Sequence, residues 1–221
     1  MGIKIKGGNM FHNRINITTG LAIVMFTVTA VYADDSPDEI QQRIGTGDPV
    51  AGKEKSALCQ NCHGEDGNSA TSDFPKLAGQ YAIYIQKQIK DFQAGRRKNE
   101  IMTDMAATVT EEQDLLDISA YFASQQKMKG AKPVFTKAGQ RRFVSEGNGC
   151  KTCHGINGKG LAPNSPFAPV IGGQHKDYLI RQLKAFQTLT RDNDMSGMMS
   201  WVAQNMTDEE IEEVAFYESG L

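Results

Sequence analysis

Two pentapeptides decide how this chain folds: Cys59-Gln60-Asn61-Cys62-His63 and Cys150-Lys151-Thr152-Cys153-His154. Both have the form C-x-x-C-H, and together they contain every cysteine of the 221-residue chain. In this pattern the two thiols add to the vinyl groups of a haem, and the next histidine is placed to ligate the iron. The sequence therefore predicts two covalently bound haem c groups.

Three other uses of paired cysteines are disfavoured. A redox dithiol needs neither a histidine at the next position nor a second copy. A zinc site would require a fourth ligand and a compact C-x-x-C partner pair, which this sequence lacks. Structural disulfides are the third alternative, and covalent haem is preferred over all three.

The segment 1–33 has the features of a secretory signal peptide. Three basic residues precede an uncharged, mostly apolar run from Ile17 to Tyr32, and Val31-Tyr32-Ala33 supplies small residues for cleavage. A retained membrane anchor is the alternative, but the apolar run is short for a stable membrane span. We expect cleavage after Ala33 and a mature chain that comprises 34–221. Export to the periplasm also provides a context that suits haem attachment.

The mature chain contains an internal repeat. Seven positions recur at a constant offset of 94: Pro75, Leu77, Gly79, Gln80, Tyr84, Gln88 and Phe92 match Pro169, Ile171, Gly173, Gln174, Tyr178, Gln182 and Phe186. Each copy carries one haem motif, which indicates duplication of a single-haem domain. We expect the first domain over residues 34–130 and the second over 131–221. Their join is expected near Lys127 to Pro133, where Lys, Gly and Pro cluster.

Both halves are expected to be helical, so the predicted fold class is all-α. Asp48-Pro49 predicts a short helix that runs into Cys59. Apolar residues at helical spacing predict helices over 81–92 and 178–186. Capping boxes that begin at Thr110 and Thr207 predict the last helix of each half. The sequence shows no convincing alternating pattern that would indicate a strand.

Histidine cannot complete the coordination of both irons. The chain has four histidines, of which His12 leaves with the signal peptide and two belong to the haem motifs. His175 alone remains, and we expect it on the surface at a helix start. A methionine thioether is the other usual sixth ligand in electron-carrying c haems, and it raises the reduction potential.

The repeat selects two of the seven methionines of the mature chain. Counting back seven residues from Val109 and Met206, the apolar positions before the capping boxes, gives Met102 and Met199. The nearest alternatives, Met105 in the first half and Met198 in the second, remain open.

Two prolines are placed to orient the proximal histidines. A histidine that ligates a metal donates its free ring N–H to an acceptor such as a backbone carbonyl. Pro75 follows His63 in the loop after the first motif, and Pro169 follows His154 in the loop after the second. Either carbonyl could serve, while the alternative is that each proline only shapes a turn.

This ordered set of motifs resembles the dihaem cytochrome c4 family. The matching elements are Cys59–Asn68, Phe74–Gln80 and Met102–Met105 in the first half, and Cys150–Gly155, Ile171–His175 and Met199 ahead of Thr207-Asp208-Glu209 in the second. The resemblance covers essentially the whole mature chain. It implies tandem cytochrome c-like domains, His/Met iron in each, pseudo-twofold packing with the haem edges close, and electron carriage in the periplasm. The chain departs from the repeat at Ala168-Pro169-Val170, where the first half has Phe74-Pro75-Lys76.

Charge is distributed unevenly along the mature chain. It has 21 basic and 26 acidic residues, a net charge of −5, and this excess lies in the first half, because the second half has 10 of each. Such asymmetry can orient a diffusing carrier on its partners. We interpret the basic runs Arg96-Arg97-Lys98 and Arg141-Arg142 as solvated surface or as partners of haem propionates rather than as docking sites. The sequence has no basic face with interleaved aromatics, so we expect no nucleic-acid partner.

The expected function is electron transfer between a quinol-oxidising complex and a terminal oxidase of the respiratory chain. We expect a monomer, with peripheral membrane association, if any, through these partners. Two six-coordinate irons would leave no open position for a substrate, so we expect a carrier and not an enzyme. The alternatives are an electron-accepting subunit of a dehydrogenase and a dihaem peroxidase-type enzyme with one five-coordinate iron. The duplicated methionines and the lack of spare histidines for acid–base work argue against the enzyme.

Overall fold

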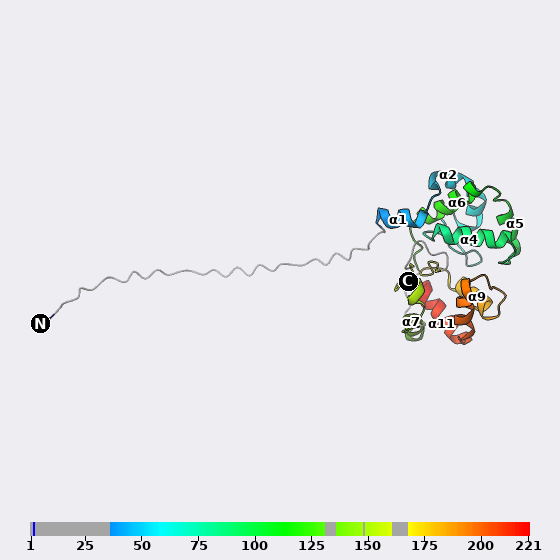
Figure 1. Ribbon diagram of the computed structural model, residues 1–221. Helices are drawn as coiled ribbons and strands as arrows, with labels where there is room; N and C mark the ends of the chain where they lie inside the picture. The colour runs from blue at the N-terminus through cyan, green and yellow to red at the C-terminus, as the bar shows by residue number, and fades with distance from the viewer. Residues whose placement is uncertain (1, 3–35, 131–135, 148, 161–167) are drawn as a thin grey trace. The chain divides into compact units, whose positions relative to one another are not determined.

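The computed structural model describes residues 2, 36–130, 136–147, 149–160 and 168–221 (Figure 1). The predicted signal peptide and its cleavage site lie outside these residues, apart from Gly2. Residue 131, where we expect the second domain to begin, also lies outside them. None of the helices in the described ranges is long and apolar enough to span a membrane.

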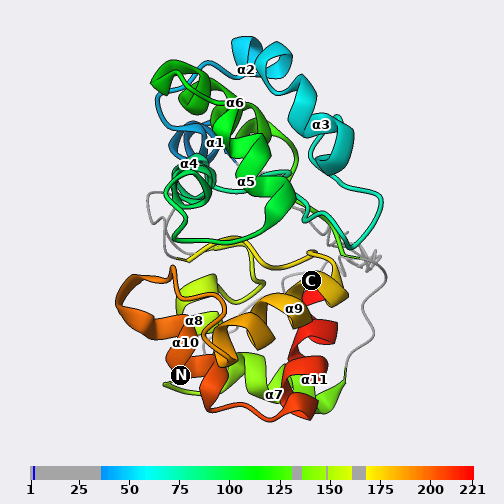
Figure 2. The same ribbon diagram turned by 90° about the vertical axis from the view of Figure 1, so that its right-hand side faces the viewer.

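The described residues form α-helices, with one short 3-10 helix and no strand, as the sequence predicts. The helices of the first half are α1 (Pro37–Ile44), α2 (Pro49–Lys55), α3 (Ala57–His63), α4 (Ala82–Gln93), α5 (Glu100–Ala107) and α6 (Glu112–Ser124). Those of the second half are α7 (Lys137–Val144), α8 (Lys151–His154), α9 (Lys176–Gln187), η1 (Met195–Gly197), α10 (Met198–Gln204) and α11 (Asp208–Ser219). Figure 2 shows α1–α6 in one group and α7–α11 in another. Both groups belong to one compact unit, Asp35–Leu221.

The predicted helix before the first haem motif is present but divided. Asp48 caps α2, because its side chain accepts hydrogen bonds from the backbone N–H groups of Val50 and Ala51, and Pro49 occupies the first turn. The prediction of one continuous helix into Cys59 is wrong. Ser56 leaves the helical conformation (φ −86°, ψ 6°), so that the haem motif lies on a separate short helix, α3.

Only one of the two predicted capping boxes forms. At the start of α11 the Thr207 hydroxyl accepts from the Glu210 N–H, and the Glu210 carboxylate accepts from the Thr207 N–H. In the first half, α6 begins one residue later than predicted. Glu111 takes the N-cap position and its side chain makes no capping hydrogen bond, so Thr110 lies outside the helix.

The two halves share the same helix crossing, which supports the duplication read from the sequence. α2 packs against α6, and α7 packs against α11. At each crossing a glycine allows the helices to approach. A Cβ on Gly52 would collide with the Asp117 carbonyl, and a Cβ on Gly139 would collide with the Glu213 carbonyl. These carbonyls lie at equivalent positions of α6 and α11, at an offset of 96 in the sequence.

Each half has its own buried apolar cluster. In the first half it comprises Ile85, Ile89, Phe92, Ala106, Leu115, Ile118, Tyr121 and Phe122, with Met102 packed against it. In the second half it comprises Phe143, Leu183, Met206, Ile211, Val214 and Tyr217, with Met199 packed against it. Both clusters therefore lie between the last helix of a half and the helix that follows its haem motif.

Candidate haem-binding site

Each of the two C-x-x-C-H motifs lies on a short helix. Cys59, Cys62 and His63 are on α3, and the second motif begins at Cys150, the N-cap of α8. A spacing of three residues places the two cysteines of a motif about one helical turn apart. All four thiols are free. Burial raises the pKa of the Cys59 and Cys150 thiols, so both are held neutral.

Both motif histidines are buried and oriented by a proline carbonyl. His63 and His154 are each 5% exposed. The Nδ1 atom of His63 lies 2.8 Å from the Pro75 carbonyl oxygen, and that of His154 lies 2.8 Å from the Pro169 carbonyl oxygen. A carbonyl only accepts, so Nδ1–H is the donor in both rings. This confirms the carbonyl role foreseen for the two prolines.

The hydrogen bond at Nδ1 leaves Nε2 of each ring available to a metal ion. Burial lowers the pKa of His63 and His154, while the proline carbonyls act in the opposite direction. Both imidazoles are therefore neutral, with a lone pair on Nε2. This is the protonation state that a metal ligand requires.

The histidines of both motifs open into one cavity of about 1210 Å³. Cys59, Cys150 and Cys153 line it as well, and Cys62 is placed by the same helix as Cys59. Apolar side chains from α4, α6, α9 and α11 form much of its wall, among them Ile85, Phe92, Ile118, Leu179, Phe186 and Val214. The cavity is therefore a largely apolar space shared by the two motifs.

Met102 and Met199 both line this cavity and pack against the core of their own half. Met105 is 37% exposed and is not part of the cavity wall. Met198 does line the cavity, but it is 54% exposed. The two methionines that the repeat selects are thus the ones that combine partial burial with a place in the cavity.

His175 stands at the N-cap of α9, as predicted, but its ring is half-buried rather than on the surface. Its Nε2 atom lies 2.9 Å from the Ser69 hydroxyl and 3.1 Å from the Ser69 carbonyl oxygen. The ring therefore links the second half to the first through hydrogen bonds, and it is not among the residues that line the cavity.

Two arginines form a crossed polar cluster in the wall of the cavity. Arg97 donates to Gln88 of its own half, and to Tyr178 and Gln182 of the second half. Arg191 donates to Gln182 of its own half, and to Tyr84 and Gln88 of the first half. Of the two interpretations of the Arg96-Arg97-Lys98 run, solvated surface is therefore wrong for Arg97, while pairing with haem propionates stays a prediction.

The repeat could have identified this cluster from the sequence. Arg97 and Arg191 are separated by the same offset of 94 that relates Tyr84 to Tyr178 and Gln88 to Gln182. The tyrosines and glutamines of this cluster are among the markers of the duplication, whereas Arg191 was missed. The missed signal was polar side chains that recur at the period of the repeat.

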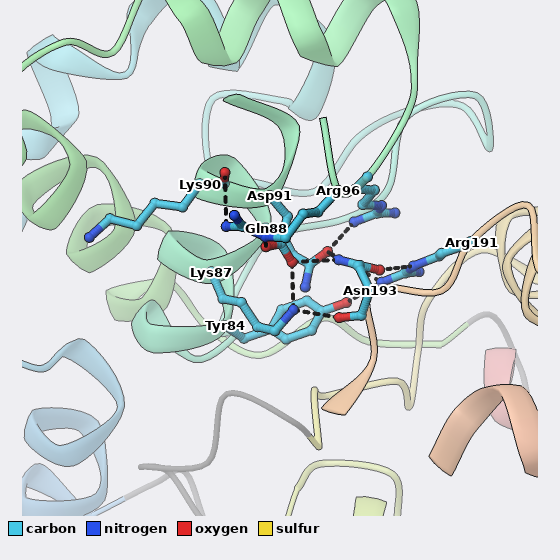
Figure 3. Close-up of polar contacts among 9 residues, drawn as sticks. Tyr84, Lys87, Gln88, Lys90, Asp91, Arg96, Arg191 and Asn193 are labelled. Atoms are coloured by element: carbon cyan, nitrogen blue, oxygen red, sulfur yellow. Dashed lines mark hydrogen bonds and ion pairs between the residues drawn. The ribbon is translucent and has the colours of Figure 1, made fainter. Parts of the chain in front are cut away.

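A carboxylate breaks the symmetry of the cluster (Figure 3). Asp91 accepts from Lys87 at 2.5 Å, from Arg96 at 2.7 Å and from Asn193 of the second half at 2.7 Å. Its burial acts to raise its pKa, but these three donors outweigh that effect and lower it. The residue 94 positions later is Ala185, so the second half has no equivalent acid.

The arrangement fits two haem c groups. Each motif supplies two thiols and a buried neutral histidine, and the shared cavity offers apolar walls to a porphyrin. Haem also carries two propionate carboxylates, and Arg97 and Arg191 provide guanidinium groups in the same wall. Within the described ranges, no cluster of three or more His, Cys, Asp or Glu side chains could hold a bare metal ion.

Comparison with known proteins agrees with this site. The cytochrome c family model matches residues 50–126 and again 136–217. Cytochrome c4 of Pseudomonas aeruginosa is 40% identical over 182 residues, which span 79% of this chain and 89% of that protein. The crystal structure of reduced recombinant cytochrome c4 from Pseudomonas stutzeri superimposes with a TM-score of 0.72 at 39% identity, over 79% of this chain and 99% of that one. A thiosulfate dehydrogenase electron acceptor of Stutzerimonas stutzeri is 33% identical over 214 residues, 90% of this chain and 91% of that protein.

Two cytochrome c domains, each with one C-x-x-C-H motif, define a dihaem c-type cytochrome. The chain belongs to the cytochrome c4 family. It is therefore an electron carrier with two covalently attached haem c groups, and not an enzyme.

Proposed function

We propose that this cytochrome carries electrons in the periplasm from a membrane quinol-oxidising complex to a terminal oxidase. The observation that carries the proposal is the pairing of a buried, carbonyl-oriented histidine with a half-buried methionine in each half of one cavity. With both axial positions taken by protein side chains, neither site offers a position to a substrate. Electrons then enter and leave through the haem edge, during brief contact with a partner.

The ligands in this proposal are assigned by position in the cavity. Cys59 and Cys62 attach the first haem, with His63 and Met102 as axial ligands. Cys150 and Cys153 attach the second haem, with His154 and Met199 as axial ligands. The hydrogen bond from each histidine to a proline carbonyl supports the proximal assignment. The partial burial of Met102 and Met199 supports their choice over Met105 and Met198.

The domain limits belong to the same proposal. The first haem domain spans residues 34–130 and the second spans 131–221, after removal of residues 1–33 by signal cleavage. The two matches of the family model, 50–126 and 136–217, fall one inside each proposed domain.

Reconstitution with membranes tests the proposed pathway. Membrane vesicles washed free of soluble cytochromes are supplied with a quinol, and oxygen uptake is followed as the purified dihaem protein is added. We expect uptake to rise with the amount of protein and to saturate. Reduction of the protein by the vesicles without any oxygen uptake would contradict the terminal oxidase as its electron acceptor.

A second candidate is an electron-accepting subunit of a dehydrogenase. It is favoured by the relative named thiosulfate dehydrogenase electron acceptor, which matches this chain over nearly its whole length. To distinguish the two candidate functions, the oxidised protein is mixed with a thiosulfate dehydrogenase and thiosulfate. Rapid reduction there, with none by the quinol-supplied vesicles, would select the second candidate.

A further inference from the structure

One buried acid of the second half has no counterpart in the first. Glu218 lies in the last turn of α11, is 3% exposed and lines the cavity. The core residues of α6 and α11 correspond at an offset of 96, as Tyr121 and Tyr217 show, so the counterpart of Glu218 is Phe122. Phe122 is 1% exposed and lines the same cavity. The position is thus apolar beside the first haem motif and ionisable beside the second.

The surroundings of Glu218 favour its neutral form. Burial raises the pKa of its carboxyl to about 8, while a hydrogen bond from the Cys150 thiol acts in the opposite direction. The carboxyl also lies at the C-terminal end of a helix, where the helix dipole disfavours an anion. No lysine, arginine or histidine forms an ion pair with it in the part of the chain that the structure describes.

The charged side chains that neighbouring helices direct toward α11 interact with residues other than Glu218. Arg142 on α7 acts on the Cys150 thiol, and Lys176 on α9 lies with its Nζ 5.4 Å from the centre of the Phe216 ring. Lys159 is another group that could take up a proton in this pH range, because burial lowers its pKa to about 8 as well. Its ammonium group donates to the backbone oxygen atoms of Met128, Gly172 and Leu221, and it does not line the cavity.

We propose that Glu218 is a proton-binding site that couples proton uptake to electron uptake at the second haem alone. When the second site accepts an electron from a redox partner, the Glu218 carboxylate takes up one proton from water. When the electron leaves, the carboxyl releases that proton. The electron and the proton balance in each direction. The inference goes beyond electron carriage and rests only on attachment of the second haem next to Cys150.

The direction of the coupling follows from electrostatics. Reduction adds one negative charge near Glu218, which disfavours the carboxylate and raises the pKa of Glu218 in the reduced protein relative to the oxidised protein. The potential of the second haem therefore falls as the pH rises between these two pKa values, and it is constant below and above them. Attachment of the haem turns Cys150 into a thioether, so the hydrogen bond that lowers the pKa is lost. The first haem, beside Phe122, has no such dependence.

Redox titration of the two-haem protein at a series of pH values tests the proposal. The series extends roughly two pH units on either side of 8. We expect one of the two one-electron waves to shift with pH, with a slope of at most about 59 mV per pH unit, the equivalent of tenfold in the equilibrium constant. In E218Q that wave should lose its slope, while the other wave is unchanged.

Two further variants keep the test decisive. K159Q removes the competing group and should retain the slope, and E218M replaces E218Q if the amide variant fails to attach its second haem. Proton uptake on full reduction, read with an indicator dye in weak buffer near pH 8, should approach one proton per chain and vanish in the Glu218 variants. A wild-type protein without a pH-dependent wave, or a slope that persists in E218Q and disappears in K159Q, would overturn the proposal.

Discussion

Arg97 and Arg191 each donate hydrogen bonds to residues of both halves of the chain. Each guanidinium donates to the glutamine of its own half and to the tyrosine of the other, Tyr178 for Arg97 and Tyr84 for Arg191. Because the two arginines also line the cavity, one set of hydrogen bonds serves two tasks. It holds the halves together and places two guanidinium groups in the wall of the cavity.

Replacement of Arg97 tests the first of these tasks. R97Q removes the donor that Tyr178 and Gln182 share, and we expect the two-haem protein to lose about 1–3 kcal/mol of stability. K98Q, at the exposed neighbouring position, should have almost no effect. Thermal or denaturant unfolding followed by circular dichroism provides the measurement. Equal losses in the two variants would mean that Arg97 contributes only surface charge.

Met102→Ala should open the first haem site. The lost thioether lowers the potential of that haem, within the roughly 0.8 V range over which axial ligands set haem potentials. We also expect carbon monoxide to bind to the reduced first haem. Met105→Ala is the matched control, because this side chain lies outside the cavity wall. Loss of the thioether signature in the Met105 variant instead would move the assignment by three residues.

Met199→Ala should have the same effect on the second haem only. Met198→Ala is the control, and it is the stricter one, because Met198 also lines the cavity while being 54% exposed. The near-infrared band of ferric iron bound to thioether sulfur reports the ligand directly. If Met198→Ala halved the intensity of this band and Met199→Ala left it unchanged, Met198 would be the ligand instead of Met199.

Cys59→Ala combined with Cys62→Ala should give a protein with one covalent haem. The second motif keeps both of its thiols and its histidine, so attachment there continues. Mass spectrometry of the denatured protein counts the haem groups that stay attached. Two retained haems would contradict the assignment of these cysteines.

Much of the fold could be predicted because the sequence contains an internal repeat. The repeat predicted the two haem domains, and the helical spacing of residues such as Ile85 and Phe92 predicted α4. The Pro75 and Pro169 carbonyls were found because the proximal histidines require an acceptor at a fixed place. The axial methionines and the domain limits remain predictions.

Other features depended on details that a one-dimensional pattern does not contain. The start of α6 is shifted by one residue from the Thr110 pattern, because Thr, Glu and Gln can cap a helix in neighbouring registers. The equivalence of Phe122 and Glu218 was missed for the same reason. An offset of 97, counted from Thr110 to Thr207, pairs Glu218 with Tyr121, whereas the true offset between α6 and α11 is 96. The hydrogen bonds of Arg97 to Tyr178 and Gln182 were not foreseen, because these two partners belong to the other half of the chain.

A redox-titrated optical spectrum of the periplasmically expressed protein would decide whether both haem sites are closed by a histidine and a methionine. It includes the near-infrared region and exposure of the reduced protein to carbon monoxide. We expect two haems per chain, the thioether band at full strength for both, and no binding of carbon monoxide. One haem that lacks the band and binds carbon monoxide would contradict this expectation, and would show an open iron in one half.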